Sequence, residues 1–243
     1  MQFIEVTGLA GVRSAVIRFT RPGTGLSFLL FPMIHIGEPA FYQEVADRLR
    51  RCDLVLAEGV GRETRSPGAE ALVASYEQLE HSERLGLVVQ DIDYRALGVP
   101  VVCPDMSGGE FESGFRRLPL RERLLIATLM PAMTAGMRMF GTRRYLARHM
   151  ATEDLMSDTE QSLADSMPGL DDLVMRRRDR LLVRALTRFD EAYTSRTGPF
   201  TVAVVYGAEH MRAASEALVG LGYHAADAEW LTVFLVDPDQ RSG

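Results

Sequence analysis

Four uninterrupted runs of apolar residues constrain the fold of this chain more than any other feature of its sequence. Runs without polar alternation predict strands that are covered on both faces, as in a parallel sheet between layers of helices. The segments between the runs supply the crossover connections that parallel neighbours need. We therefore predict an α/β fold with a mixed, mostly parallel central sheet flanked by helices. The runs are LSFLLFPMI at 26–34, LVLA at 54–57, VVC at 101–103 and FTVAVVY at 200–206.

The rest of the chain fits around this sheet as a single α/β domain over residues 1–243. Alternating residues and two glycines predict a β-hairpin before Pro22, and the chain is expected to end in a strand over 230–236. Between 109 and 195 the pattern is helical and charged, which predicts a helical insertion within the domain. Further helices are expected from Pro39, around Leu72–Leu79 and after Tyr206.

The composition allows a sizeable core and excludes several kinds of catalytic site. The chain has 243 residues, of which 47% are hydrophobic, and a formal charge of −6. All 27 cationic side chains are arginines, so a P-loop and a Schiff-base nucleophile, which both need lysine, are excluded. The acidic balance argues against a nucleic-acid partner, because binding to phosphates needs a basic face. Two cysteines and a start without a signal-peptide pattern predict a reduced, cytoplasmic setting.

An apolar stretch over residues 124–140 needs a separate interpretation. It holds 17 residues with one charge, Arg138, whereas a membrane-spanning helix needs about 20 apolar residues. A buried helix, a helical lid or a partner-binding hairpin is therefore favoured, and peripheral membrane contact through this stretch is the less favoured alternative. Its four methionines are typical of gap-filling in a core. The sequence leaves homo-oligomerisation open.

Two histidines follow apolar runs in matched settings. In FLLFPMIH and AVVYGAEH, His35 and His210 each come after a buried run and near the start of a helix. Ligands of open α/β sheets bind at the carboxyl ends of strands, so both imidazoles are expected at that edge. Glu58 follows the LVLA run, where an unpaired charge would be costly. Asp105 follows the third run, where it either joins the same site or caps a turn.

Two histidines and a carboxylate from separate strands are a recognised ligand set for a catalytic metal with open positions. Such a metal acidifies a bound water and polarises a carbonyl. If His35, Glu58 and His210 share an ion, their side chains must meet in one pocket. The chain has no Gly-x-Ser-x-Gly, His-Glu-x-x-His or Gly-x-Gly-x-x-Gly motif. Cys103 is expected to be a buried strand cysteine and therefore an inert one.

One combined pattern joins segments from both ends of the chain. It consists of IHIG at 34–37, LVLAEGV at 54–60, RRRDRLLVRAL at 176–186, and VVYGAEH at 204–210 followed by LVGLGY at 218–223. Together these motifs resemble the TIKI/TraB family, which is grouped with the erythromycin-esterase-like and ChaN-like proteins. That family is marked by two Gly-x-x-His motifs, a glutamate after the second strand and an Arg-Asn pair late in a helical region. The resemblance extends from about residue 26 to 224, and GAEH is its most specific part.

Carried over residue by residue, the resemblance implies a site formed by His35, Glu58, Arg178 and His210, with Gly207 as a secondary candidate. Arg178 would neutralise an oxyanion, the electrostatic contribution that usually dominates acyl transfer. Consecutive helical residues point about 100° apart, so its two preceding arginines are not expected to face the same site.

The chain departs from the family pattern at two positions. Pro32 stands where the first motif of the family has glycine, and Asp179 stands where asparagine is usual. The Asp179 carboxylate would either strengthen metal binding or pair with an arginine. Arg178 is expected to be held by a carboxylate, with Glu58 and Asp179 as the nearest candidates.

The resemblance and the residues together predict metal-dependent hydrolysis of a peptide or a small-molecule substrate. His35, His210 and Glu58 would hold a divalent metal, which the sequence leaves open between Mn, Co and Zn. Family members include metal-dependent peptidases that act on secreted signalling proteins, and bacterial proteins that suppress a peptide pheromone. ChaN-like proteins bind haem instead. The alternative is therefore a non-catalytic protein that binds a peptide or haem in the same crevice.

Overall fold

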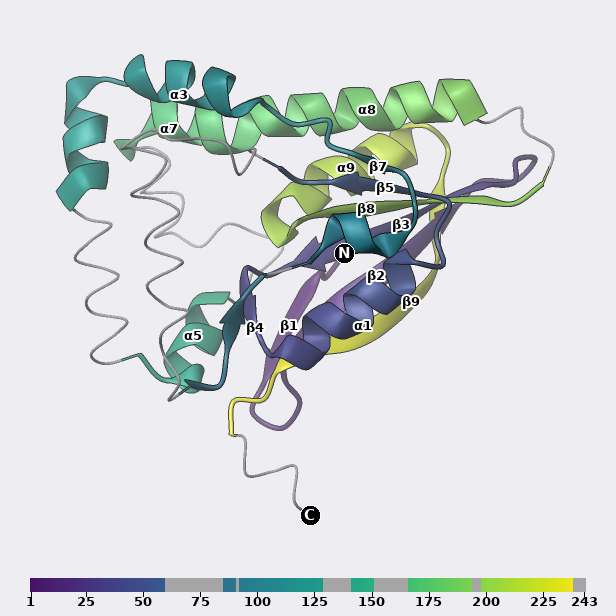
Figure 1. Cartoon of the computed structure of the whole chain (residues 1–243), viewed down its shortest axis with the longest axis horizontal. Coiled ribbons are helices and arrows are strands. Elements are labelled where there is room, and N and C mark those ends of the chain that lie inside the picture. The colour runs from purple at the N-terminus through teal and green to yellow at the C-terminus, as the bar shows by residue number, and fades with distance from the viewer. Residues whose placement is uncertain (60–84, 91, 129–140, 151–165, 194–197, 238–243) are drawn as a thin grey trace.

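The computed structural model describes residues 1–59, 85–90, 92–128, 141–150, 166–193 and 198–237. The predicted helix around Leu72–Leu79 and residues 129–140 lie outside these ranges. Within them, seven strands form one mixed sheet and two short strands pair separately (Figure 1). The strands of the sheet are β1 (Ile4–Thr7), β2 (Gly11–Thr20), β3 (Leu26–Met33), β5 (Leu54–Ala57), β7 (Val101–Val102), β8 (Phe200–Gly207) and β9 (His224–Phe234). The separate pair is β4 (Ile36–Gly37) with β6 (Val88–Val89).

The centre of the sheet is parallel, as the uninterrupted apolar runs predicted. β8 lies between β3 and β5, and β5 also pairs with β7, all in parallel orientation. All four residues of β5 are buried, as expected for a strand with helices on both sides. β2 pairs with β1, β3 and β9 in antiparallel orientation and extends the sheet on one side. The predicted α/β fold with a mixed, mostly parallel central sheet is therefore confirmed.

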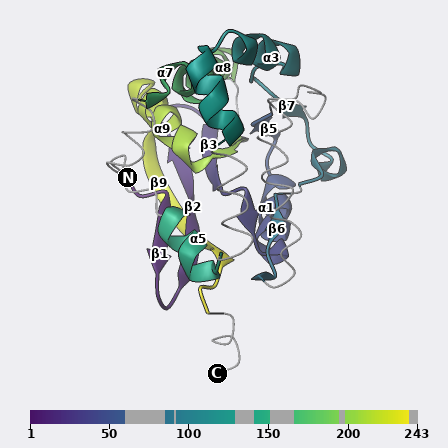
Figure 2. The same cartoon turned by 90° about the vertical axis from the view of Figure 1, so that its left-hand side faces the viewer.

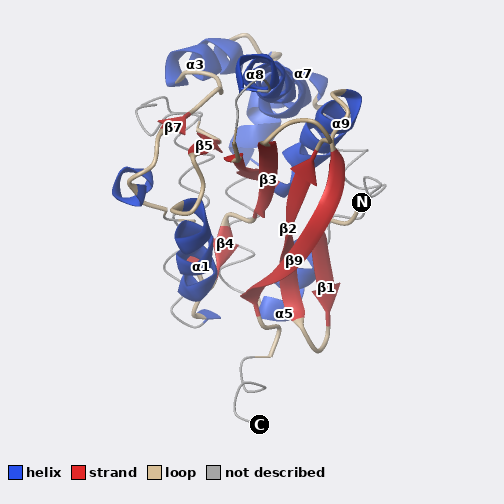
Figure 3. Cartoon of the chain, turned by 90° about the vertical axis from the view of Figure 1, so that its right-hand side faces the viewer, coloured by secondary structure: helices blue, strands red, loops and turns tan. Residues whose placement is uncertain are grey.

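Helices cover both faces of this sheet. Figures 1 and 3 show α1 (Pro39–Leu49) on one face and α9 (Met211–Gly220) with α8 (Arg177–Tyr193) on the other. Proline suits the first turn of α1, because its missing N–H has no partner there in any helix. Each helix turns apolar residues at three- or four-residue spacing toward the sheet. These residues are Phe41, Tyr42, Val45 and Leu49 in α1, Met211, Ala214 and Leu218 in α9, and Leu182, Ala185 and Leu186 in α8.

The described residues between 109 and 195 form helices joined by short loops, as the helical pattern of this region predicted. α3 and residues 120–128 bury their own hydrophobic cluster against the start of α8. Leu173 fills the space where a side chain at Gly114 would collide with it. α5 packs on β1 and β2 instead (Figure 2), so the helices of this region contact two separate parts of the fold. Its elements are α3 (Gly108–Arg116), α5 (Arg143–Met150), α7 (Pro168–Asp171) and one π-helical turn, η3 (Asp172–Arg176), that leads into α8.

Several local expectations need correction. Among the described strands, β7 ends at Val102 and lies at the edge of the sheet beside β5. Cys103, the next residue, is exposed rather than buried. His35 lies in a bend between β3 and β4 rather than at the start of a helix. The final strand, β9, is longer than expected and already begins at His224.

The first residues of the 124–140 stretch do not form a buried helix. Residues 120–128 are helical, but only Glu122 and Ile126 among them are buried, because one side of this helix alone contacts the protein. Among the helices that the structure describes, none has the length and apolar character needed to cross a membrane.

Candidate functional site

The register of the parallel strands brings the predicted site residues to one edge of the sheet. Met33 at the end of β3 is opposite Gly207 at the end of β8, and Ala57 at the end of β5 is opposite Val205. The segments that follow these strands therefore emerge side by side, although they lie far apart in the sequence. His35, Glu58 and His210 are in these segments, and the first turn of α8 reaches the same edge (Figure 1).

Arg178 joins two of the carboxylates through a buried fork of hydrogen bonds. Its Nε donates to both oxygens of Asp105 at 3.1 Å, and its Nη2 donates to Asp105 Oδ2 at 2.6 Å and to Glu58 Oε1 at 2.5 Å. Only 9% of the Arg178 side chain is exposed. Arg176, by contrast, is on the surface and pairs with Asp171. The prediction that Arg178 rather than Arg176 faces the site is confirmed, and Glu58 and Asp105 are its partners.

Main-chain amides hold the same carboxylates from the other side. Glu58 Oε2 accepts a hydrogen bond from the Gly207 N–H at 2.5 Å. Asp105 accepts from the Met106 N–H at 2.7 Å and from the Gly59 N–H at 3.3 Å. Burial alone would raise the pKa of Glu58, but Arg178, the neighbouring histidines and the Gly207 N–H together lower the pKa below its ordinary value. Glu58 is therefore held as a carboxylate.

His210 is oriented by a carboxylate from α8. Its Nδ1 lies 2.7 Å from Asp179 Oδ1, and since an ionised carboxylate only accepts, Nδ1 carries the proton. The other nitrogen, Nε2, is turned toward Glu58 Oε1 at 3.9 Å. The Asp179 carboxylate thus pairs with His210. Among the described contacts, Arg178 makes no hydrogen bond with Asp179. Of the two candidate partners of Arg178, Glu58 is therefore the one that the structure shows, because the neighbouring side chains of Arg178 and Asp179 leave the helix in different directions.

Gly207 lies where three of the predicted site residues converge. A Cβ atom at Gly207 would be 3.3 Å from Glu58 Oε2, 3.7 Å from His210 Cδ2 and 3.9 Å from His35 Nε2. The predicted meeting of these side chains in one place is confirmed. His35 is the most exposed of them, whereas His210 is buried. Because Gly207 has no side chain, these three side chains can all approach its backbone.

The carboxylate of the expected ligand set for a divalent metal already has other partners. Among the described residues, no group of three or more His, Cys, Asp or Glu side chains could hold a metal ion. Glu58, the carboxylate of the expected ligand set, already binds the Arg178 guanidinium with one oxygen and the Gly207 N–H with the other. A cation at Glu58 would have to displace a positive charge that is already paired.

One further residue at this edge, Tyr206, was not identified from the sequence. Tyr206 is fully buried, its ring meets the His210 imidazole edge-on at 5.9 Å, and its hydroxyl has no hydrogen-bond partner among the described residues. Burial, followed by the charges of Asp105 and Glu58, raises the pKa of Tyr206 and keeps the phenol protonated. The sequence signal that could have identified Tyr206 was its position as the last residue of an apolar run, directly before Gly207.

Cys103 also lies near this edge. Burial and Asp105 raise the pKa of the Cys103 thiol, which disfavours a nucleophilic role.

Replacing Tyr206 by phenylalanine is expected to raise the melting temperature by about 2–4 °C. A buried hydroxyl without a partner costs about 1 kcal/mol or more, and this change removes it while it keeps the ring. Differential scanning calorimetry measures the effect. Tyr42→Phe is the matched control, because the buried Tyr42 hydroxyl donates to the Ile34 carbonyl at 2.8 Å and its loss should lower the melting temperature. Equal losses in both variants would show that the Tyr206 hydroxyl has a bound partner.

Replacing Glu58 by glutamine is expected to lower the free energy of unfolding at pH 7 by about 1.5–3 kcal/mol, the range for hydrogen bonds to charged groups. The pKa of Glu58 is lower in the folded state, so its stabilisation is present above the unfolded pKa of about 4.3 and is lost as the pH falls through the folded value. The difference between wild type and variant should therefore shrink below about pH 4.3. Urea denaturation across this range measures it, with Glu44→Gln at a half-exposed helix position as control. A difference that does not vary with pH would contradict the prediction.

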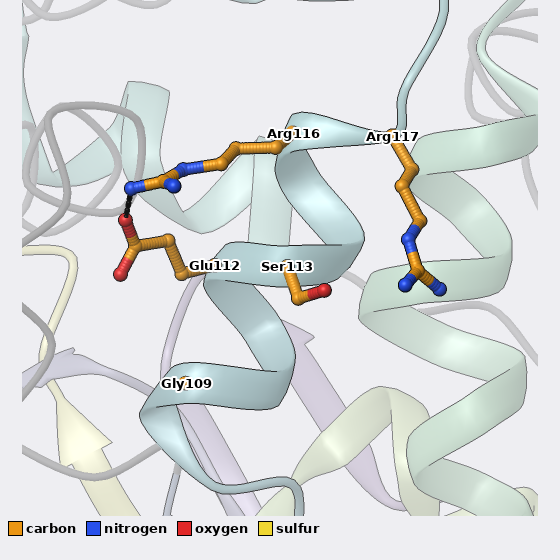
Figure 4. A pocket seen from close by; sticks show the side chains of 5 residues that line it. All are labelled: Gly109, Glu112, Ser113, Arg116 and Arg117. Atoms are coloured by element: carbon orange, nitrogen blue, oxygen red, sulfur yellow. Dashed lines mark hydrogen bonds and ion pairs between the residues drawn. The ribbon is translucent and has the colours of Figure 1, made fainter.

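A separate hollow lies on α3, away from the edge of the sheet. It has a volume of about 290 Å³ and is lined by α3 and the residue that follows it (Figure 4). Arg116 turns to Glu112 there, and Arg117 is directed away from both. None of the predicted site residues lines this hollow. Its lining residues are Gly109, Glu112, Ser113, Arg116 and Arg117.

Comparison with known proteins returned no family model, no curated protein and no solved structure that matches this chain.

Proposed function

We propose that this protein is a hydrolase that cleaves an acyl bond, in a peptide or a small-molecule amide or ester, at the edge where β3, β5 and β8 end. The observation that carries the proposal is the Asp179–His210 pair. A carboxylate on Nδ1 fixes the tautomer and leaves Nε2 as the proton acceptor, as in many catalysts of acyl transfer. This Nε2 is turned toward the ion cluster of Glu58 and Arg178, beside Gly207.

His210 would act first as a base and then as an acid. Its Nε2 accepts a proton from a water molecule while the water oxygen forms a bond to the substrate carbonyl carbon, and the carbonyl π electrons move to oxygen. When the tetrahedral intermediate collapses, the bond from carbon to the leaving nitrogen or oxygen breaks, and His210 returns its proton to that leaving atom. Asp179 stabilises the transient imidazolium. Positioned proton transfer of this kind typically contributes about 10²–10⁴-fold.

Arg178 would stabilise the oxyanion. Its Nε and Nη2 are held by Asp105 and Glu58, and Nη1 makes no hydrogen bond among the described contacts. A guanidinium that is fixed by two carboxylates before the reaction does not have to reorganise as negative charge develops on the substrate. His35, on the exposed side of Gly207, would contact the substrate at the entrance.

The divalent metal stays a prediction, with His35, His210 and Glu58 as its ligands. Because Glu58 is paired with Arg178 in this arrangement, the proton transfers described above do not depend on a bound metal. Metal analysis of the purified protein for Mn, Co and Zn tests this point directly.

The experiment is a hydrolysis screen with the purified full chain. A p-nitrophenyl ester series and a mixture of quenched fluorescent peptides are offered with and without added Mn²⁺, Co²⁺ or Zn²⁺, and His210→Ala is measured in parallel. The proposal requires turnover by the wild type that is lost in the variant. Turnover that persists in His210→Ala would remove His210 from the reaction and overturn the proposed mechanism. A wild type that binds a peptide or develops a haem Soret band without any turnover would favour the non-catalytic binding alternative.

A further inference from the structure

The helix of residues 120–128 has a fixed inner side. Glu122 is fully buried and accepts hydrogen bonds from the Leu170 N–H at 2.9 Å and the Gly169 N–H at 3.4 Å, at the N-terminus of α7. Ile126, one turn further along, is buried in the hydrophobic cluster under α3. Two contacts four residues apart define which face of a helix is turned inward.

The opposite face of this helix is apolar. Leu120 and Leu124 are four residues apart, and their exposed fractions are 69% and 57%. Leu125 is exposed to 44% beside them. The pattern is inverted compared with an ordinary surface helix, since a carboxylate is turned inward while leucines are turned to solvent. This helix forms one end of the molecule along its longest axis (Figure 1) and lies toward the viewer in Figure 2.

Arginines border the leucine ridge. Arg121 and Arg123 are both exposed, and their positions next to Leu120 and Leu124 place them on its two flanks. Arg117, in the turn before this helix, is also exposed, and so is Arg116 at the end of α3, where it pairs with Glu112. Within residues 116–128 the carboxylate of Glu122 is the sole acidic group, and it is turned inward. This surface is therefore cationic on a chain with a net charge of −6.

We infer that residues 116–128 form a docking surface for an anionic membrane. An exposed apolar ridge between cationic flanks is the arrangement of an interfacial helix, in which the apolar side chains enter the boundary of the acyl chains and arginines remain at the headgroups. Anionic lipids attract each nearby arginine, and the leucines add apolar burial. A second copy of the chain fits less well, because a symmetric contact through this ridge would bring the same arginines face to face. The inference does not depend on the proposed hydrolysis.

The test is sedimentation of the full chain with lipid vesicles. Vesicles of phosphatidylcholine with about one third phosphatidylglycerol should bind the protein, vesicles of phosphatidylcholine alone should bind it weakly, and about 1 M salt should release it. Leu124→Glu should weaken binding at least tenfold, roughly the effect of losing one buried leucine and adding an opposing charge. Arg121→Glu and Arg123→Glu should each weaken it about fivefold or more.

Leu9→Glu is the matched control, because Leu9 is 82% exposed in the turn between β1 and β2, at a different part of the surface. It should bind as the wild type does. All of these positions are exposed, and circular dichroism verifies that each variant is folded. Absence of binding to the anionic vesicles, or equal loss in Leu9→Glu and Leu124→Glu, would overturn the inference. A wild-type dimer in light scattering that becomes a monomer in Leu124→Glu would overturn it in favour of a second copy.

Discussion

Arg178→Ala is expected to lower the free energy of unfolding by about 3–5 kcal/mol, the largest stability effect that we expect of any single surface or site substitution in this chain. The guanidinium lies between Glu58 and Asp105 with 9% of its side chain exposed. Its removal would leave two carboxylates close together with no cation between them, and breaking a buried ion pair from one side carries a cost of about this size. Urea denaturation at pH 7 measures the difference.

Arg176→Ala is the control, since Arg176 is two residues away on the same helix and its side chain is 71% exposed. Its effect should stay within about 0.5 kcal/mol. Arg178→Lys and Arg176→Lys extend the comparison to activity: lysine keeps the charge at position 178 but loses the planar fork, so hydrolysis should fall far more in Arg178→Lys. Equal, small effects of both alanine changes would show that Arg178 is not the cation that holds the cluster together.

Asp179→Asn is expected to reduce the turnover number by about 10²–10⁴-fold, provided that a substrate is found, while the fold is retained. An asparagine at this position can present either its carbonyl or its amide to His210, so the imidazole is no longer fixed with the proton on Nδ1. It also no longer stabilises the imidazolium that forms during the reaction. Nitrogen NMR of the His210 ring reports the tautomer without any substrate and should change in the variant.

Asp172→Asn is the matched control, because Asp172 is exposed and pairs with Arg180 at the surface near the start of the same helix. Neither its turnover number nor the His210 ring signals should change. A variant Asp179→Asn that keeps both wild-type turnover and wild-type ring signals would remove His210 from the proton-transfer role and limit Asp179 to a structural contact.

The sheet and much of the site could be predicted because they depend on order along the chain. An uninterrupted run such as LVLA specifies a strand that is covered on both faces, and parallel strands deliver whatever follows them to one edge. This reasoning is sufficient for the convergence of His35, Glu58 and His210, which the strand register then shows in detail.

Pairings between side chains could not be predicted in the same way. Glu58 and Asp179 were the candidate partners of Arg178, but the choice of partner depends on the direction in which neighbouring residues leave α8, and this angle is not visible in the sequence. Tyr206 was hidden for another reason, because an aromatic residue at the end of a buried run is indistinguishable from ordinary core. Cys103 was misplaced because a two-residue edge strand is too short for periodicity to define its end.

The π-helical turn that precedes α8 has a consequence for how this region tolerates change. Leu173 fits against Gly114, and Arg178 binds the carboxylates. In a regular α-helix, the spacing of the residues alone would set the angle between these two side chains. The wider π turn takes in one extra residue, so the rotation from Leu173 to Arg178 is smaller than in an α-helix with the same number of residues. A deletion of one residue over 172–176 should therefore be tolerated, because a regular α-helical turn covers nearly the same rotation with one residue fewer, whereas a one-residue deletion further along α8 would turn one end of the helix against the other.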